Sequence, residues 1–329
     1  MSLRTKTRIH VEDWEPAYGS PYLVDGDDPV EASLVEDGGE LRFHRPPEVE
    51  LADVAHGKLG LAFVDGVRRA EASLYQVSET GQTGRGIAGS HACGVVLAPF
   101  DRSIPVFGPA VIERVAVWGS GMEGALPAIA SWSWRSVVIE DDAPDAPLRE
   151  LQERMRLSEA RLAEEISAEG FLTVVDGPLH HVRSRDLPVV GYIKTHHRTL
   201  LPPQHHAKVP ELRSGERTSL FAMGSDRYST YLRLAQTPAL SGPWSGIVRL
   251  EIPQSAGFET AARIADAMAV ALPRFAGVPH RDPRAPQNLQ PVGALESHLR
   301  HLLGSVELAR RAVREAVTRI EAPSSGNGG

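Results

Sequence analysis

Apolar residues fall mostly into short runs typical of buried strands, and three longer stretches have the 3.6-residue spacing of amphipathic helices. The runs predict strands at residues 59–64, 70–77, 90–99, 109–118, 134–140, 171–175, 187–194, 218–223, 230–235 and 246–252. The helical spacing predicts helices at residues 147–168, 258–272 and 291–320. The order of elements indicates an α/β protein.

The first predicted helix carries a carboxylate on its apolar side. Its stripe is formed by Leu148, Leu151, Met155, Leu162 and Ile166. Glu159 fills the gap in this stripe, four residues after Met155 and three before Leu162. Because a carboxylate that faces the core needs a cation or another partner, Glu159 is a candidate metal ligand or a member of a buried ion pair.

Two further carboxylates follow apolar strands. Asp65 comes after residues 61–64 and Asp176 comes after residues 171–175, and a glycine follows each of them. We expect each strand to end at its aspartate and the two side chains to meet at one edge of the sheet. Their repulsion would raise a pKa or attract a cation. Either aspartate alone also fits a simple turn residue.

Three strands, a helix and a further strand fit the core of the ribonuclease H-like fold, a mixed sheet flanked by helices. By analogy with that fold, its active site places carboxylates on the first strand, the first helix and the next strand. Asp65, Glu159 and Asp176 occupy these places. We expect an irregular, β-rich N-terminal extension at residues 1–56, the main domain at 57–322 and a disordered tail at 323–329.

The composition is that of an ordinary globular protein, with 42% hydrophobic and 23% charged residues in a chain of 329. A single cysteine excludes a disulfide within the chain and favours a reducing compartment. The N-terminus resembles no secretory signal, and no apolar run approaches the roughly 18 residues of a membrane span. We therefore expect a cytoplasmic protein that does not enter a membrane.

Charge is unevenly distributed along the chain. The net charge of −7 argues against a protein that coats nucleic acid non-specifically. Residues 181–217 are nevertheless basic. This stretch suits either a strip that binds phosphates or a solvated loop.

Oxygen ligands without thiolates suit a hard cation such as Mg²⁺ or Mn²⁺. Two such ions can activate water and stabilise the leaving oxygen of a phosphodiester. Lys194, at the end of a predicted strand, fits a contact to the phosphate. His280 and Asp282, in a proline-rich turn, are candidates for a fourth ligand, although the turn also fits a plain polar loop.

Several segments together resemble the NurA nucleases, especially the bacterial branch, over roughly residues 58–315. These segments are Phe63–Gly66, Met155–Glu159, Val174–Leu179, Val190–Lys194, Tyr231–Leu234, Trp244–Glu251 and Asp282–Leu289. One departure is that Val67 follows Gly66 where the family often has serine.

The resemblance implies a Mn²⁺-dependent 5′–3′ DNA exonuclease with single-strand endonuclease activity, for which Mg²⁺ is a possible substitute. It also implies a homodimer that acts with a HerA-type hexameric ATPase in DNA end resection and repair. By position, Asp65, Glu159 and Asp176 would hold the metal, and Lys194 would contact phosphate.

Further DNA contacts are expected on the predicted strands and loops around this site. Arg233 and Arg249 alternate with apolar neighbours and are candidates for lining a single-strand channel. Arg198, Gln287 and Asn288 are the other expected DNA contacts. A different class of function fits the same fold: a catalytically silent scaffold that binds DNA and a motor ATPase without cutting.

Overall fold

One mixed sheet organises the part of the chain that the computed structural model describes: residues 8–11, 32–47, 58–102, 104–183, 187–196, 199–237, 242–278, 280 and 284–321. Its strands are β1 (Arg8–Val11), β2 (Ala32–Leu34), β3 (Phe43–His44), β4 (Gly60–Val77), β5 (Thr83–Pro99), β6 (Val106–Trp118), β7 (Arg135–Val138), β8 (Phe171–Asp176), β9 (Val189–Ile193), β10 (Arg217–Thr218), β11 (Phe221–Met223), β12 (Arg227–Arg233) and β13 (Ile247–Pro253). The helices are α1 (Ala146–Ala168), α2 (Pro203–His206), α3 (Phe258–Ala271), α4 (Gln290–Leu302) and α5 (Val306–Glu321), with short 3₁₀ turns at Asp37–Gly39, Val209–Glu211, Gln254–Ala256 and Leu272–Phe275.

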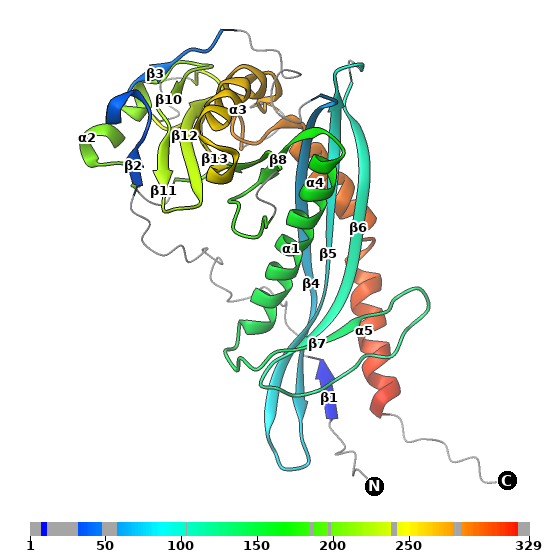
Figure 1. The fold of residues 1–329 in the computed structure, drawn as a ribbon. Coiled ribbons are helices and arrows are strands. Elements are labelled where there is room, and N and C mark those ends of the chain that lie inside the picture. Colours follow the sequence, from blue (N-terminus) through cyan, green and yellow to red (C-terminus); the bar gives the residue numbers. More distant parts are fainter. Residues whose placement is uncertain are drawn as a thin grey trace, which may run out of the picture.

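The centre of the sheet has the predicted ribonuclease H-like arrangement. The strands lie in the order β6-β5-β4-β8-β9, and the path continues through β13, β12, β11 and β2. Strands β4, β5 and β6 are antiparallel neighbours, whereas β8 runs parallel to β4 and β9 runs parallel to β8. Figure 1 shows α1 on one face of the long strands and α4 and α5 on the other. The expected mixed α/β fold is therefore confirmed.

The predicted end of the strand at Asp65 is wrong. Strand β4 does not stop at Asp65 but continues through Gly66 to Val77, pairing along its length with β5 from Gly60↔Pro99 to Val77↔Thr83. The backbone needs no turn at Gly66 because β5 supplies hydrogen-bond partners on both sides of it. Asp65 consequently lies inside a strand of 18 residues.

The predicted helix at residues 291–320 is two helices, α4 and α5. Gly304, between them, has a φ of 76°. This left-handed backbone conformation ends an α-helix and suits glycine, which has no Cβ to clash. The break lets α4 cover the middle of the sheet while α5 packs against the far end of the long strands, where Val313 and Val317 contact Leu74 and Trp118 in one apolar cluster.

Side-chain alternation along β4 separates two cores. Ala62 and Val64 pack with Leu162 and Ile166 of α1. The alternate residues of β4, Leu61, Phe63 and Val67, pack on the other face, in a core that includes residues of α3 and α4. Because side chains on a strand alternate between faces, Asp65 belongs to the face covered by α4.

Part of the predicted N-terminal extension joins the same sheet. Strand β2 pairs with β11, and β3 pairs with β10. The predicted domain boundaries remain predictions, and the predicted tail at residues 323–329 lies outside the described residues. Within the described ranges, none of the helices combines the length and the apolar character needed to cross a lipid bilayer.

Candidate metal centre

The register of the parallel strands brings the two predicted aspartates together. Val64 of β4 pairs with Val175 of β8, so Asp65 and Asp176 are the next residues on neighbouring strands. Asp176 pairs in turn with Tyr192 of β9, two residues before Lys194. Since Leu61, Phe63, Val174 and Tyr192 share the core under α4, alternation directs these polar side chains to that same face.

A third carboxylate completes the cluster, and it is one that the sequence reasoning missed. Ligand oxygens of Asp65, Asp176 and Glu296 all lie within 4.8 Å of one another. Glu296 is on α4, on the buried stripe that includes Val292, Leu295 and Leu299. The signal that identified Glu159, a carboxylate within an apolar helical stripe, would have identified Glu296 as well.

Glu159 approaches the cluster from α1, on the opposite face of β4. It is 6% exposed. A Cβ atom built on Gly66 would lie 2.5 Å from Glu159 Oε1, so only glycine leaves room for this carboxylate. The Gly66 backbone N–H donates a hydrogen bond to Glu159. Glu159 is therefore a neighbour of the three close carboxylates, held where β4 lacks a side chain.

Among the described residues, Lys194, Arg284 and Arg300 make direct contacts with Asp176 or Glu296. Lys194 Nζ donates to Asp176 Oδ2 and, at 2.9 Å, to Asn288 Oδ1. Arg284 forms a two-pronged pair with Glu296, with Nη1–Oε1 at 2.9 Å and Nη2–Oε2 at 3.1 Å. Arg300 Nη2 lies 3.2 Å from Glu296 Oε2. These contacts fix the carboxylates but leave Asp65 the least directly neutralised of the three.

Burial and mutual repulsion together disfavour the charged forms of these acids. Burial raises the pKa of Asp65 well above its usual range, and Asp176 and Glu159 raise it further. Burial, followed by the charge of Asp176, raises the pKa of Glu159 to about 8. Burial also raises the pKa of Asp176, although Lys194 opposes this shift. A divalent cation would relieve the repulsion that these shifts express.

The clustered carboxylates open onto a cavity of about 490 Å³. Its walls include Asp65, Asp176, Lys194, Glu296 and both arginines that pair with Glu296. The ligand atoms offered here are carboxylate oxygens, which suit Mg²⁺ or Mn²⁺ better than softer metals. The residues present therefore fit a hard divalent cation.

Of the two expected fourth ligands, only His280 is among the described residues, and it is not in this cluster. His280 is exposed. Two groups of acidic and histidine side chains among the described residues could hold an ion, and His280 belongs to neither group. Asp282 and Arg198 lie outside the described residues. Asn288 is at the site through its bond to Lys194, and the main-chain oxygen of Gln287 accepts a hydrogen bond of 2.6 Å from Tyr192.

Arg233 and Arg249 are not where a DNA channel would need them. The Arg233 guanidinium donates to the main-chain oxygens of Ser245, Pro243 and Pro210. Arg249 Nη1 lies 2.6 Å from Glu251 Oε1. Both arginines are buried. Both arginines therefore face the protein interior. Arg233 binds main-chain oxygens of neighbouring loops and Arg249 binds a buried acid, so neither is a surface contact for DNA.

A second group of potential ligands, Glu36, Asp37 and His44, lies just after β2 and in β3, and β2 is several strands away from β8 and β4 in the sheet. Glu36 accepts from Arg217 and from the Leu220 backbone N–H, and Asp37 is bonded to Ser219 and His44. Because protein donors already satisfy these oxygens, we interpret this group as a structural network of ion pairs and hydrogen bonds.

Comparisons with known proteins identify the family of this chain. No curated protein matches the sequence. Among solved structures, the fold is similar to that of the NurA nuclease from Sulfolobus solfataricus, with 9% identity and a TM-score of 0.42, covering 79% of this chain and 84% of that one. The family model of the NurA domain matches residues 101–292, which is more than half of the chain. The chain therefore belongs to the NurA family.

Proposed function

We propose that this chain is a metal-dependent DNA nuclease whose ions are held by Asp65, Asp176 and Glu296, with Glu159 completing the site. The observation that supports this most directly is the approach of three carboxylates to within 4.8 Å in a hollow bordered by lysine and arginine. A cluster of this kind is costly in the absence of a cation.

Two divalent ions, when bound, would activate water for attack on the phosphorus and stabilise the leaving oxygen. The chain's own residues provide the remaining functions. Lys194, held between Asp176 and Asn288, places a positive charge where an anionic phosphate would enter. Arg284 and Arg300 sit at the rim of the same cavity and can exchange a carboxylate contact for a phosphate contact.

The more detailed activity rests on family membership. We propose 5′–3′ exonuclease and single-strand endonuclease activity with Mn²⁺ as the preferred ion and Mg²⁺ as an alternative. On the same ground we propose a homodimer that works with a HerA-type hexameric ATPase in DNA end resection and repair, in the cytoplasm.

The test is hydrolysis of end-labelled single-stranded and duplex DNA in Mn²⁺, Mg²⁺ or chelator. We expect shortening of the DNA with metal alone, and its loss in Asp65→Asn and Glu296→Gln. Asp101→Asn, an exposed aspartate outside the site, is the matched control and should cut normally. Intact DNA under every condition, with the wild-type protein folded and binding DNA, would refute the nuclease and favour a silent scaffold for a motor ATPase.

A further inference from the structure

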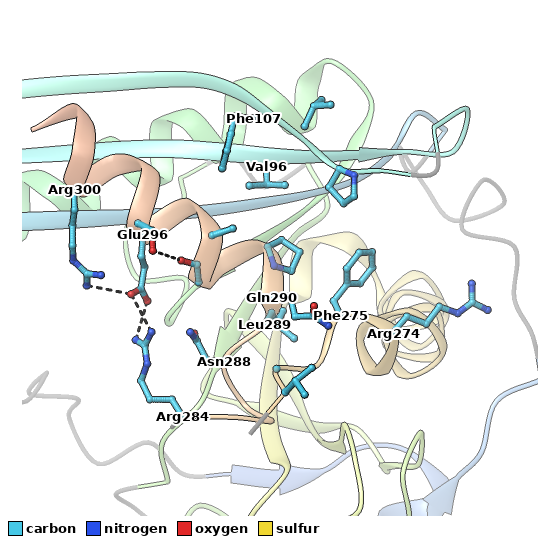
Figure 2. A pocket seen from close by; sticks show the side chains of 18 residues that line it. Val96, Phe107, Arg274, Phe275, Arg284, Asn288, Leu289, Gln290, Glu296 and Arg300 are labelled. Carbon is cyan, nitrogen blue, oxygen red and sulfur yellow. Dashed lines mark hydrogen bonds and ion pairs between the residues drawn. The ribbon is translucent and has the colours of Figure 1, made fainter. Parts of the chain in front are cut away.

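A second cavity lies next to the carboxylate cavity and shares a wall with it. Its volume is about 790 Å³, within the range of pockets that hold small organic ligands. Arg284, Glu296 and Arg300 line both cavities. Figure 2 shows these three side chains paired at one end of the second cavity, with Phe275 and Arg274 toward the other end. If a polymeric ligand placed a phosphate in the carboxylate cavity, the group next to that phosphate would therefore lie beside the second cavity.

The walls of this cavity combine apolar surface with a few polar groups. Val96, Val278 and Leu289 contribute aliphatic surface, and Phe107 and Phe275 contribute aromatic rings. The Gln290 side chain, which donates to the Ala276 main-chain oxygen, adds an amide to the lining. A planar ring system with polar edges is the ligand that such walls suit, because it needs stacking surfaces and a few hydrogen-bonding groups.

Both aromatic rings are held in place by other rings. Phe107 stacks on His298 with centroids 4.2 Å apart and planes 13° from parallel. Phe275 packs edge-on against Phe63 at 4.9 Å. Phe107 is nevertheless 49% exposed, so much of its surface remains open to a ligand. Rings held in this way give up little conformational entropy when a base stacks on them.

Charge favours an anionic ligand over a neutral or cationic one. Among the described residues that line the cavity, the charged ones are Arg274, Arg284 and Arg300 and one acid, Glu296. This local excess of positive charge stands out on a chain with a net charge of −7. A strand of nucleotides supplies both components that the cavity suits, the phosphate for the arginines and the base for the apolar walls.

We propose that this cavity receives an unpaired base of the DNA strand whose phosphate lies at the carboxylate cluster. The inference rests on the proposed function, because it takes the neighbouring cavity to be the site of phosphodiester cleavage. If a base enters this cavity, the protein should prefer single-stranded or unwound DNA ends, because a base in a duplex is stacked and paired and cannot enter the cavity.

The test separates base binding from phosphate binding. Fluorescence anisotropy in chelator compares a labelled single-stranded oligonucleotide with an abasic strand of equal length and charge. Wild-type protein should bind the base-bearing strand about 5- to 150-fold more tightly, the range expected from stacking one base on an aromatic ring. Phe107→Ala should remove most of this preference and leave affinity for the abasic strand unchanged.

A second variant and two matched controls protect the test against misfolding. Ser297→Trp, an exposed position that lines the cavity, should block it and remove the same preference. Phe100→Ala changes a phenylalanine of nearly equal exposure, 48%, outside the cavity, and His301→Trp places the same bulky group on another exposed turn of α4. Both control variants should retain the wild-type preference.

Two results with the variants would overturn the inference. One is an equal preference for bases in the wild type, Phe107→Ala and Ser297→Trp. The other is a change in oligomeric state of Phe107→Ala and Ser297→Trp by light scattering, which would make this face an interface between copies of the chain. Cleavage that proceeds without any base preference would refute the inference alone, whereas base-dependent binding without cleavage in any metal would refute only the nuclease.

Discussion

Replacing Glu159 by glutamine should stabilise the metal-free protein and abolish its activity. Glutamine has nearly the same shape as glutamate, and its amide oxygen can still accept the Gly66 backbone N–H. It removes only the ionisable group. The folded protein must keep Glu159 protonated up to a pKa of about 8, whereas the unfolded chain loses that proton near 4.5.

The size of the effect follows from this difference. The folded state binds a proton at Glu159 that the unfolded chain releases. The resulting loss of folding free energy is absent below pH 4.5, grows as the pH rises and levels off above about pH 8. At pH 7 the cost is about 3 kcal/mol, and at pH 5 it is about 1 kcal/mol. Glu159→Gln avoids this cost and should raise the free energy of unfolding by about these amounts.

Urea denaturation in chelator at both pH values measures the free energy of unfolding. Glu165→Gln, an exposed position on the same helix, is the control and should change stability by less than about 0.5 kcal/mol. The reasoning fails if Glu159→Gln is no more stable than the wild type at pH 7, or if its gain is as large at pH 5 as at pH 7. Cleavage of DNA in Mn²⁺ should be lost in the same variant.

Three further predictions concern the ions, the lysine and a buried arginine. Mn²⁺ at about 100 times its dissociation constant should raise the free energy of unfolding of the wild type by about 2.7 kcal/mol in thermal or urea melts, with a much smaller gain in Asp176→Asn. Lys194→Ala should lower the cleavage rate by roughly 10²–10³-fold, as loss of a charge-stabilising donor does, whereas Lys208→Ala, at an exposed position, should cleave at the wild-type rate. Arg249→Met should lower the free energy of unfolding by about 3 kcal/mol, because it takes a buried partner from Glu251. Folded Arg249→Met should still bind single-stranded DNA as the wild type does, and a selective loss of DNA affinity would instead place Arg249 on a DNA surface.

The sequence was sufficient to predict most strands and helices because their patterns are local, whereas the ribonuclease H-like arrangement of these elements and the candidate site rested on analogy with that fold. Alternating apolar runs marked the strands, and a single interruption of an apolar stripe marked Glu159. The end of the strand at Asp65 was mispredicted because glycine after aspartate reads locally as a turn, whereas pairing with a distant strand keeps β4 extended. No local pattern reveals which strand will supply that pairing.

Glu296 and the two predicted channel arginines show the same limit. The position of Glu296 opposite Asp65 and Asp176 depends on how α4 crosses the sheet, and the break at Gly304 determines where α4 ends. For Arg233 and Arg249, alternation along a strand fixed which residues share a face but did not reveal that both faces of that part of the sheet are covered. Their burial is a property of the assembled layers.

The continuity of β4 determines which part of the centre can adjust. Asp65 is anchored at mid-strand, paired through Gly94 to β5 and adjacent to the last residue joined to β8. Its backbone cannot shift without breaking ladder hydrogen bonds in both directions. Glu296 is carried by a separate helix that is tethered to the rim by exposed arginines. Any tightening around an incoming ion should therefore come from the helix moving toward the strand, which makes Asp65 the fixed reference point of the site.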